Sequence, residues 1–302
     1  HQVRPSFSEA LMTHTSTSPN YQILASLDVG RRQAELEGFE MVQHQLELAM
    51  ALREGVASHP LISKYFRFLV AKDLIPAEYR QSGIASYYSE DNGWANNQME
   101  LAWEQDDFVI DPTRLTLYLG KTGIDGDTFK NRYLMDKYGI QINKTSRNTV
   151  LFMTNIGTTR SSVAFLLEVL VRIATELDSD NEDACHVEKR IMQRRVRSLT
   201  EDLPPLPDFS RFSREFLRND GSDVPDGKIR AAYFLASQAE CEYFPVDDDS
   251  IELEMEKGRD LVSACFVIPY PPGFPILVPG QVISEEILAF MRALDVKEID
   301  GY

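Results

Sequence analysis

The chain has 302 residues, of which 31 are Lys or Arg and 47 are Asp or Glu, so its formal net charge is −16. This acidic balance argues against nucleic acid and against anionic membranes as partners, because both require a basic surface. No apolar run approaches the ~18–20 residues that span a bilayer, and the first residues lack the pattern of a signal peptide.

The three cysteines, Cys185, Cys241 and Cys265, are far apart and form no CxxC pair. Neither a disulfide framework nor a zinc site is indicated, so we expect no metal. Cys185 and His186 are neighbours, but adjacent residues on a helix point in different directions. A cytoplasmic protein in a reducing environment is the natural interpretation.

A cluster of hydroxyl side chains opens the chain, with five in the six positions from Thr13 to Ser18. Ser18 and Pro19 predict the N-cap and first position of a helix. The spacing of apolar residues extends this helix over 20–56, with a break allowed at its glycines. Because a cap needs only one hydroxyl, the others leave two interpretations open, simple capping or an anion site at the helix N-terminus.

The next hundred residues contain a change of pattern. Residues 61–70 predict a further helical or mixed segment. Residues 79–107 are polar and aromatic without a clear period, so we predict an irregular connection and a domain boundary there.

From residue 108 the pattern becomes mixed. Alternation around Leu115 predicts a strand, and 125–139 predicts a helix capped by Asp127 and ended by Gly139. Two short strands, 140–144 and 149–155, follow. Thr158 or Thr159 then opens a strongly amphipathic helix. This order predicts a small α/β unit with helices on one face of a sheet.

The remaining residues are interpreted mainly as structural. A polar helix over 182–199 contains several basic residues, which we interpret as a solvated face that pairs with the surplus acids. A helix is expected over 228–241, then a buried strand and a proline-rich turn within 262–280, and a last helix capped by Ser284. The prolines favour a rigid turn, with a role at an active-site entrance as the alternative.

Four linked motifs resemble one known family. They are "MTHTSTSPNYQILASLD", "VIDPTRLTLYLG", "YGIQINKTSRNTVLFMTNIG" and "VIPYPPGFPILVPGQVISEEI". Together they resemble the bacterial ornithine/lysine/arginine decarboxylases, which are pyridoxal-phosphate enzymes of the aspartate-aminotransferase fold. The resemblance implies α/β and α+β architecture, the C-terminal part of such a fold type I enzyme with a family-specific C-terminal domain.

The resemblance also implies a division of the chain. Residues 1–78 would end the large cofactor domain and supply a dimer-interface helix, and 79–107 would be the connection. Residues 108–180 would form the small aminotransferase-like domain. Residues 181–302 would form the decarboxylase C-terminal domain.

The resemblance implies where the site residues lie. The family's Schiff-base lysine belongs to a Ser-x-His-Lys motif, which is expected upstream of His1, so no catalytic residue is assigned here and the chain alone is expected to be inactive. Thr15 and Ser16 would contact the cofactor phosphate across the dimer interface. Asn143 stands where the family has an acidic residue near the distal amine of the substrate. An amide supplies no counter-charge, which leaves the substrate open.

The implied reaction is decarboxylation of a basic amino acid with pyridoxal 5'-phosphate. Lysine, giving cadaverine and carbon dioxide, is the first choice, arginine the second and ornithine the third. A homodimer with shared active sites is expected, with a pentamer of dimers as the larger assembly. The alternative of another class is a non-catalytic assembly or regulatory module of this fold.

Overall fold

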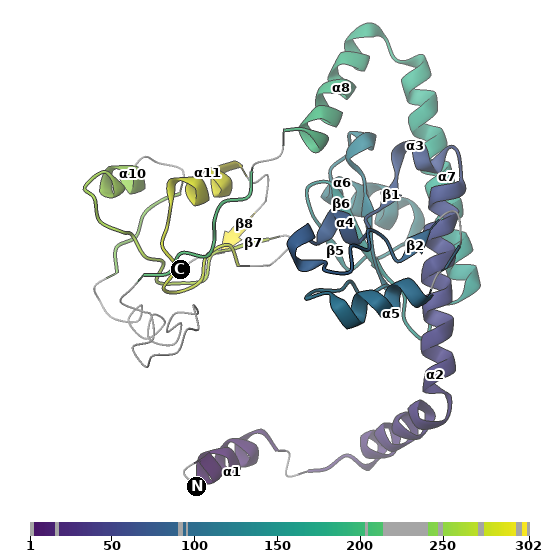
Figure 1. Ribbon diagram of the computed structural model, residues 1–302. Coiled ribbons are helices and arrows are strands. Elements are labelled where there is room, and N and C mark those ends of the chain that lie inside the picture. The colour runs from purple at the N-terminus through teal and green to yellow at the C-terminus, as the bar shows by residue number, and fades with distance from the viewer. Residues whose placement is uncertain are drawn as a thin grey trace.

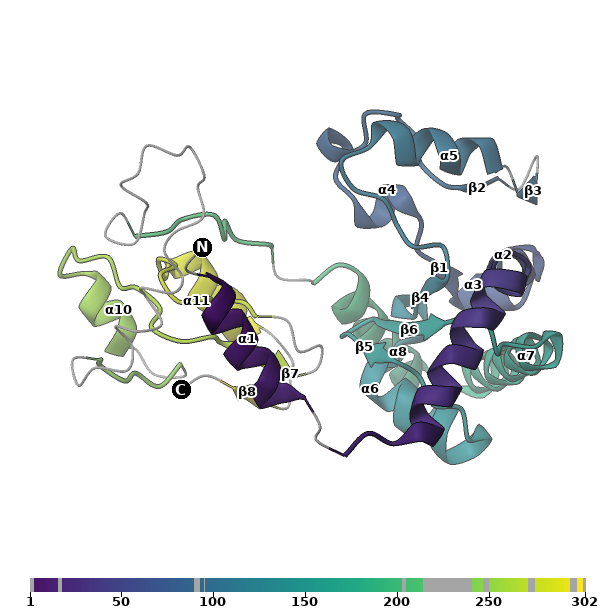
Figure 2. The ribbon, with the colours of Figure 1, turned by 90° about the horizontal axis from the view of Figure 1, so that it is seen from below.

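The computed structural model describes residues 3–15, 18–89, 93–94, 96–202, 205–213, 241–246, 250–270, 275–293 and 298–300. Figure 1 shows a helical arm at the N-terminus, an α/β body, and a C-terminal unit that is joined to the body by the segment after α8. The same three parts are seen from below in Figure 2.

The arm consists of α1 (Val3–His14) and the first half of α2 (Tyr21–Ser58). The long helix is confirmed, but its N-cap is Asn20 and not Ser18, because Asn20 Oδ1 accepts from the N–H groups of Gln22 and Ile23 at 3.0 and 3.2 Å. The helix does not break at its glycines, although Figure 1 shows it bent. Helix α1 was not predicted.

A four-stranded antiparallel sheet lies in the body. Its order is β1 (Arg67–Phe68), β4 (Arg114–Tyr118), β6 (Thr149–Met153) and β5 (Lys144–Thr145). The register pairs Leu115 with Phe152 and Leu117 with Val150. Because side chains alternate along a strand, this register places these four apolar residues on one face of the sheet.

That face forms the main core of the protein. Leu115, Leu117 and Val150 are fully buried and share one hydrophobic cluster with residues of α2, α3 (Ile62–Tyr65) and α7 (Arg160–Asp183). On the opposite face Met153 is 40% exposed. The predicted arrangement, with helices on one face of a sheet, is therefore confirmed.

The helical segment after β4 differs from its prediction. Asp125, and not Asp127, caps α6 (Gly126–Thr128), since Asp125 Oδ1 accepts from Thr128 N–H at 2.9 Å. The chain then continues as a π-helix, η3 (Phe129–Asp136). The predicted end at Gly139 is confirmed by its φ of +65°, a left-handed conformation that favours glycine.

Residues 79–107, predicted to be irregular, contain regular structure. After α4 (Ala71–Leu74) and the short η1 (Ala77–Tyr79), the strands β2 (Tyr88–Ser89) and β3 (Gly93–Trp94) pair, and α5 (Asn96–Gln105) follows. A small cluster of buried residues, which includes Tyr87, Met99 and Ala102, stabilises this part. Because this cluster contains few apolar residues, their spacing along the sequence gives only a weak periodic signal.

The end of the chain forms its own small core. Thr159 is the N-cap of α7. Helix α8 (His186–Thr200) packs against η2 (Gly120–Thr122) of the body. The C-terminal unit contains α10 (Ser250–Met255), β7 (Ile268–Tyr270), α11 (Glu285–Ala293) and β8 (Glu298–Asp300). The Ser284 cap is confirmed, because its Oγ accepts from Ile287 N–H at 3.2 Å. The helix expected over 228–241 lies outside the described residues except for its last position.

Candidate functional site

The hydroxyl cluster lies at the junction of α1 and α2. Thr15 Oγ1 donates to the carbonyl of Leu11 at 2.6 Å, and Thr13 Oγ1 donates to Glu9 in the same way at 2.8 Å. Both side chains are exposed, whereas Ser16 lies outside the described residues. Thr15 lies between the C-terminus of α1 and the N-terminus of α2.

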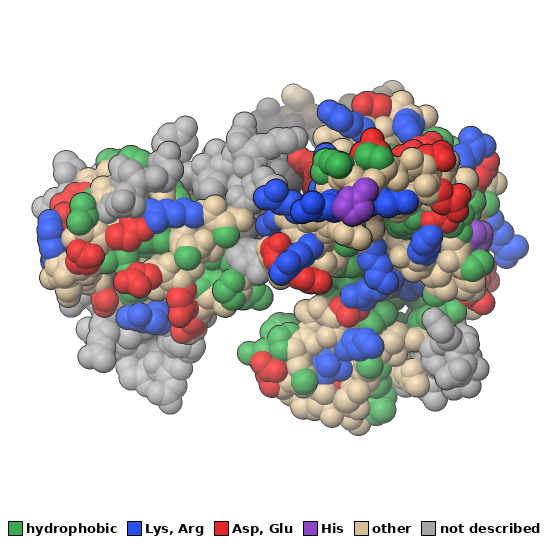
Figure 3. All heavy atoms as spheres, turned by 90° about the horizontal axis from the view of Figure 1, so that it is seen from above, with side chains coloured by type: hydrophobic (Ala, Val, Ile, Leu, Met, Phe, Trp, Pro, Cys, Tyr) green, Lys and Arg blue, Asp and Glu red, His purple; other side chains and the backbone are tan. Residues whose placement is uncertain are grey.

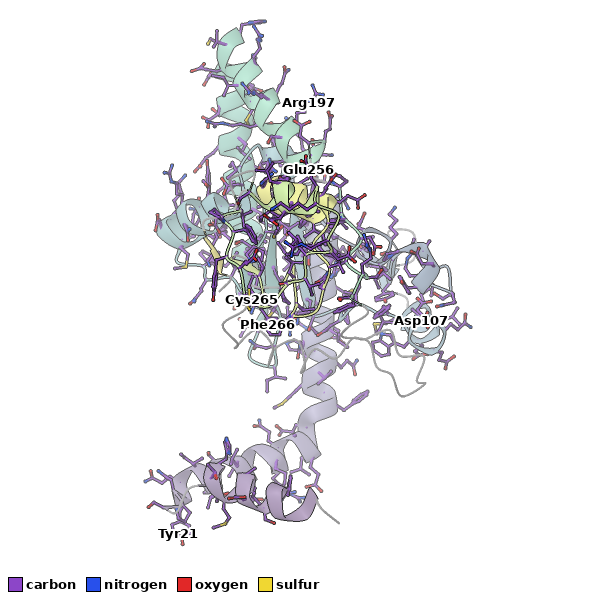
Figure 4. All side chains as sticks on the ribbon, turned by 90° about the vertical axis from the view of Figure 1, so that its left-hand side faces the viewer. Tyr21, Asp107, Arg197, Glu256, Cys265 and Phe266 are labelled. Atoms are coloured by element: carbon purple, nitrogen blue, oxygen red, sulfur yellow. The ribbon has the colours of Figure 1, made fainter. Side chains whose placement is uncertain are left out.

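The start of α2 has its own satisfied amides. Asn20 occupies two of the N–H groups that would otherwise attract an anion. Figure 4 shows Tyr21 in the arm at the lower end of the view, pointing away from the body. An anion at this junction would thus be held by side-chain hydroxyls, with Thr15 turning away from Leu11.

Asn143 lies at the start of the edge strand β5. Its backbone N–H donates to the carbonyl of Leu151 at 3.1 Å, and its side chain is exposed. Two residues later, the buried hydroxyl of Thr145 donates to Asp127 Oδ1 at 2.9 Å. These two hydrogen bonds, one from the backbone of Asn143 and one from the side chain of Thr145, hold the segment in place. The Asn143 side-chain amide remains accessible to a ligand.

The structure does not bring the two predicted sites together. Figure 1 shows the α1–α2 junction within the arm, well away from β5 in the body. A single copy of the chain therefore cannot present Thr15 and Asn143 to one ligand in this arrangement.

A buried arginine was not anticipated from the sequence. Arg53 of α2 is only 9% exposed, and it donates to the carbonyls of Leu69 and Arg114 at 3.2 and 3.0 Å. Its guanidinium also lies 5.5 Å from the centre of the Phe68 ring. Burial lowers the pKa of Arg53 to about 10, which still leaves it charged at neutral pH. The available signal was its spacing, four residues after Ala49 and three before Val56, both on the buried face of the helix.

The basic residues of α8 form an exposed surface. Figure 3 shows basic side chains gathered over the end of the body that carries α7 and α8. Arg197 forms ion pairs with Glu201 and Asp202, at 3.3 and 3.7 Å. Arg190 and Arg194 are exposed and form no ion pair within the described part of the chain. The prediction of a solvated face is therefore confirmed, but among the described residues most of these cations form no ion pair with an acid, so the predicted pairing with the surplus acids is seen there for Arg197.

The described residues contain neither a candidate metal cluster nor a candidate membrane span. No group of three or more His, Cys, Asp or Glu residues there is placed to hold a metal ion. Among those residues, too, no helix is long and apolar enough to cross a membrane.

Comparison with known proteins identifies the class of this fold. Residues 3–162 match the family described as Orn/Lys/Arg decarboxylase, major domain, and residues 229–299 match the C-terminal domain of the same family. The chain belongs to the Orn/Lys/Arg decarboxylase family. The predicted fold class, the C-terminal part of a fold type I enzyme with a family-specific domain, is confirmed.

Individual relatives agree with this family. The chain is 23% identical to the arginine decarboxylase of Bacillus subtilis (strain 168) over 277 residues, which cover 92% of this chain and 41% of the relative. It is 24% identical to the constitutive lysine decarboxylase of Escherichia coli (strain K12) over 315 residues, covering 95% and 41%. The crystal structure of the Francisella novicida lysine decarboxylase LdcF aligns with a TM-score of 0.56 at 20% identity, covering 94% and 40%. The chain thus spans about two-fifths of the length of the curated relatives it matches.

Proposed function

We propose that this chain is the C-terminal part of an enzyme that decarboxylates a basic amino acid with pyridoxal 5'-phosphate. Membership of the Orn/Lys/Arg decarboxylase family, through two matching domains, is the observation that carries the proposal. Lysine is the proposed substrate and cadaverine the product. Arginine is the second choice and ornithine the third. Relatives named for all three substrates match at 23–24% identity, so the comparisons do not rank the substrates.

Pyridoxal phosphate, when bound, accepts the negative charge that remains after carbon dioxide leaves. The proposed task of this chain is to hold its phosphate with the hydroxyls of Thr15 and Ser16. Thr15 fits that task, because its exposed hydroxyl would exchange a neutral bond to Leu11 for a stronger, charge-assisted one. The lysine that binds the cofactor is proposed to come from outside the 302 residues, since no Ser-x-His-Lys motif occurs within them.

Asn143 is proposed to recognise the distal end of the substrate. Its exposed amide oxygen could accept a hydrogen bond from an ammonium or guanidinium group. Because the amide is neutral, this contact discriminates less strongly between basic substrates than a carboxylate would. The hydrogen bond from Thr145 to Asp127 supports the proposal by fixing the segment that carries Asn143.

A homodimer with shared active sites is proposed for a geometric reason. The α1–α2 junction, which carries Thr15, lies far from β5, which Asn143 precedes (Figure 1), so an active site that used both residues would take them from different copies. The arm also has apolar side chains to cover, since eleven large hydrophobic residues are exposed between positions 7 and 42: Phe7, Leu11, Met12, Tyr21, Ile23, Leu24, Leu27, Val29, Leu36, Phe39 and Val42. Burial of such side chains drives association.

The accessible surface supports the same proposal. The chain exposes 20327 Å², whereas a compact monomer of its mass of 34.4 kDa would expose roughly 12,900 Å² by the usual scaling. A pentamer of such dimers, located in the cytoplasm, is the larger assembly we propose. The three free cysteines are compatible with that compartment.

The proposal is tested by assaying amine product from lysine, arginine and ornithine with added pyridoxal phosphate. Two proteins are compared, the 302-residue chain and a polypeptide in which the family's cofactor-binding segment precedes it. We expect product only from the longer protein, with lysine turned over fastest. Cofactor-dependent absorbance without turnover of any of the three amino acids would instead favour the alternative, a non-catalytic assembly module of this fold.

A further inference from the structure

A cavity of about 290 Å³ lies in the body, beside the buried Arg53. Its walls come from the second half of α2, from residues 63–71, from residues 86–88 and from two residues just before β4. It lies apart from Thr15 and Asn143, and the proposed reaction makes no use of it. The cavity therefore needs an explanation of its own.

Within the described part of the chain, Arg53 is a buried cation without an anionic partner. A guanidinium has five N–H groups, and those of Arg53 reach two acceptors among the described residues, the carbonyls of Leu69 and Arg114. Both acceptors are neutral. A buried charge is costly unless it is paired, so Arg53 favours any anion that can reach it.

The acids beside these two acceptors already have other partners. Asp73, close in sequence to Leu69, accepts from Arg67 Nη1 at 2.8 Å and from the N–H of Val70 at 3.0 Å. Asp111 lies 3.7 Å from Arg114 Nε. Neither carboxylate neutralises Arg53. Burial lowers the pKa of the Arg53 guanidinium to about 10.

The walls of the cavity define the ligand that would suit it. Most of its lining is apolar, including Met50, Val56, Phe66 and Ile110, with a few hydroxyls such as that of Ser63. Ligand sites combine such apolar walls with a small number of placed polar groups. A carboxylate matches the planar fork of a guanidinium, whereas a highly charged phosphate would lose its hydration against apolar walls.

We propose that this cavity binds a small monocarboxylate with an apolar body, whose carboxylate pairs with Arg53 while its body occupies the apolar end. The ligand would link α2 to the edges of β1 and β4, because Arg53 contacts the backbone beside both strands. Its binding is independent of the proposed decarboxylation and is measured without any turnover.

Benzoate and its uncharged analogue benzamide are suitable probes. On the 302-residue chain, we expect benzoate to raise the unfolding temperature with increasing concentration, as a ligand of the folded state does, and benzamide to have no such effect. Isothermal titration should give one site per chain. In Arg53→Gln, the dissociation constant for benzoate should rise roughly tenfold or more, because a charge-assisted hydrogen bond is lost.

Two further variants separate binding from folding. Ala57 is exposed and lines the cavity, so Ala57→Phe should block benzoate while leaving Arg53 and its two bonds unchanged. Arg190→Gln, on the exposed surface of α8, is the matched control and should bind benzoate as the original chain does. Equal responses to benzoate and benzamide, full binding by Ala57→Phe, or no response of the original chain would each overturn the proposal.

Discussion

The hydroxyl of Thr145 donates a 2.9 Å hydrogen bond to Asp127 Oδ1 and thereby joins the edge strand β5 to the helical segment that begins at Gly126. Thr145 is only 4% exposed, so its hydroxyl has little access to water. Gly126 is required beside it, because a Cβ there would lie 2.1 Å from the carbonyl oxygen of Ser146. The two contacts fix the segment that carries Asn143.

Asp127→Ala should destabilise the protein by about 1–3 kcal/mol, because it leaves the Thr145 hydroxyl buried without this acceptor. Urea unfolding followed by circular dichroism measures the loss. The double variant Asp127→Ala/Thr145→Val removes the orphaned hydroxyl as well, so it should recover part of the stability. If the double variant were no more stable than the single one, the hydrogen bond would not be the cause.

Asn143→Glu, in a polypeptide that carries the family's cofactor-binding segment, should raise kcat/KM for lysine and change its ratio to that for arginine. A carboxylate adds a charge-assisted bond to the distal cation, so we expect a change of roughly fivefold or more in the ratio. Steady-state kinetics with both amino acids measures it. Gln141→Glu adds the same charge two residues away and should leave the ratio unchanged, and an equal effect of both variants would refute direct contact.

Thr15→Val should weaken binding of pyridoxal phosphate to the same longer polypeptide, by roughly tenfold for one charge-assisted hydrogen bond. Thr13→Val is a closely matched control, because both hydroxyls donate to a helix carbonyl four residues earlier. Both variants therefore lose the same local bond. Cofactor titration by absorbance should separate them, and identical dissociation constants would exclude a phosphate contact by Thr15.

Asn20→Ala should loosen the start of α2, since the Asn20 side chain is the N-cap acceptor for two amides. The loss of a cap costs about 1 kcal/mol. Hydrogen exchange should show faster exchange of the Gln22 and Ile23 amides. Asn20→Asp keeps the acceptor and adds a negative charge at a helix N-terminus, so those amides should stay protected; unprotected amides in Asn20→Asp would contradict the assignment.

Stability at acid pH should depend on Asp73. Burial alone would raise the pKa of this carboxyl, but hydrogen bonds from Arg67 and the N–H of Val70 outweigh it and lower the pKa. With a lowered folded-state pKa, the contribution is present above the unfolded value of ~3.9 and is lost as the pH falls through the folded value. The urea midpoints of Asp73→Asn and the original chain should differ at pH 7 and converge in acid. A difference that is constant with pH would sink the assignment.

Much of the body could be predicted from local patterns. The alternation around Leu115 predicted β4, and Gly139 marked the end of the helical segment before it. Thr158 or Thr159 was expected to open α7, and the structure has Thr159 as its cap. Each of these signals depends on a few neighbouring residues. The N-caps of α6 and α2 were harder to predict. Asp125 and not Asp127, and Asn20 and not Ser18, accept from the first N–H groups of these helices, and this depends on the backbone conformation at each residue.

The sequence alone determined the family resemblance, the acidic balance and the order of most helices and strands, because these depend on residue types and their spacing along the chain. Only the tertiary structure decided that the α1–α2 junction lies far from β5 and that Arg53 is buried beside a cavity. Those relationships join residues distant in sequence, such as Arg53 and Arg114, and no local period encodes them. The physical reason is that burial and proximity are properties of the packed chain. On an exposed face of the helix, the same arginine would be solvated and would not need an anion.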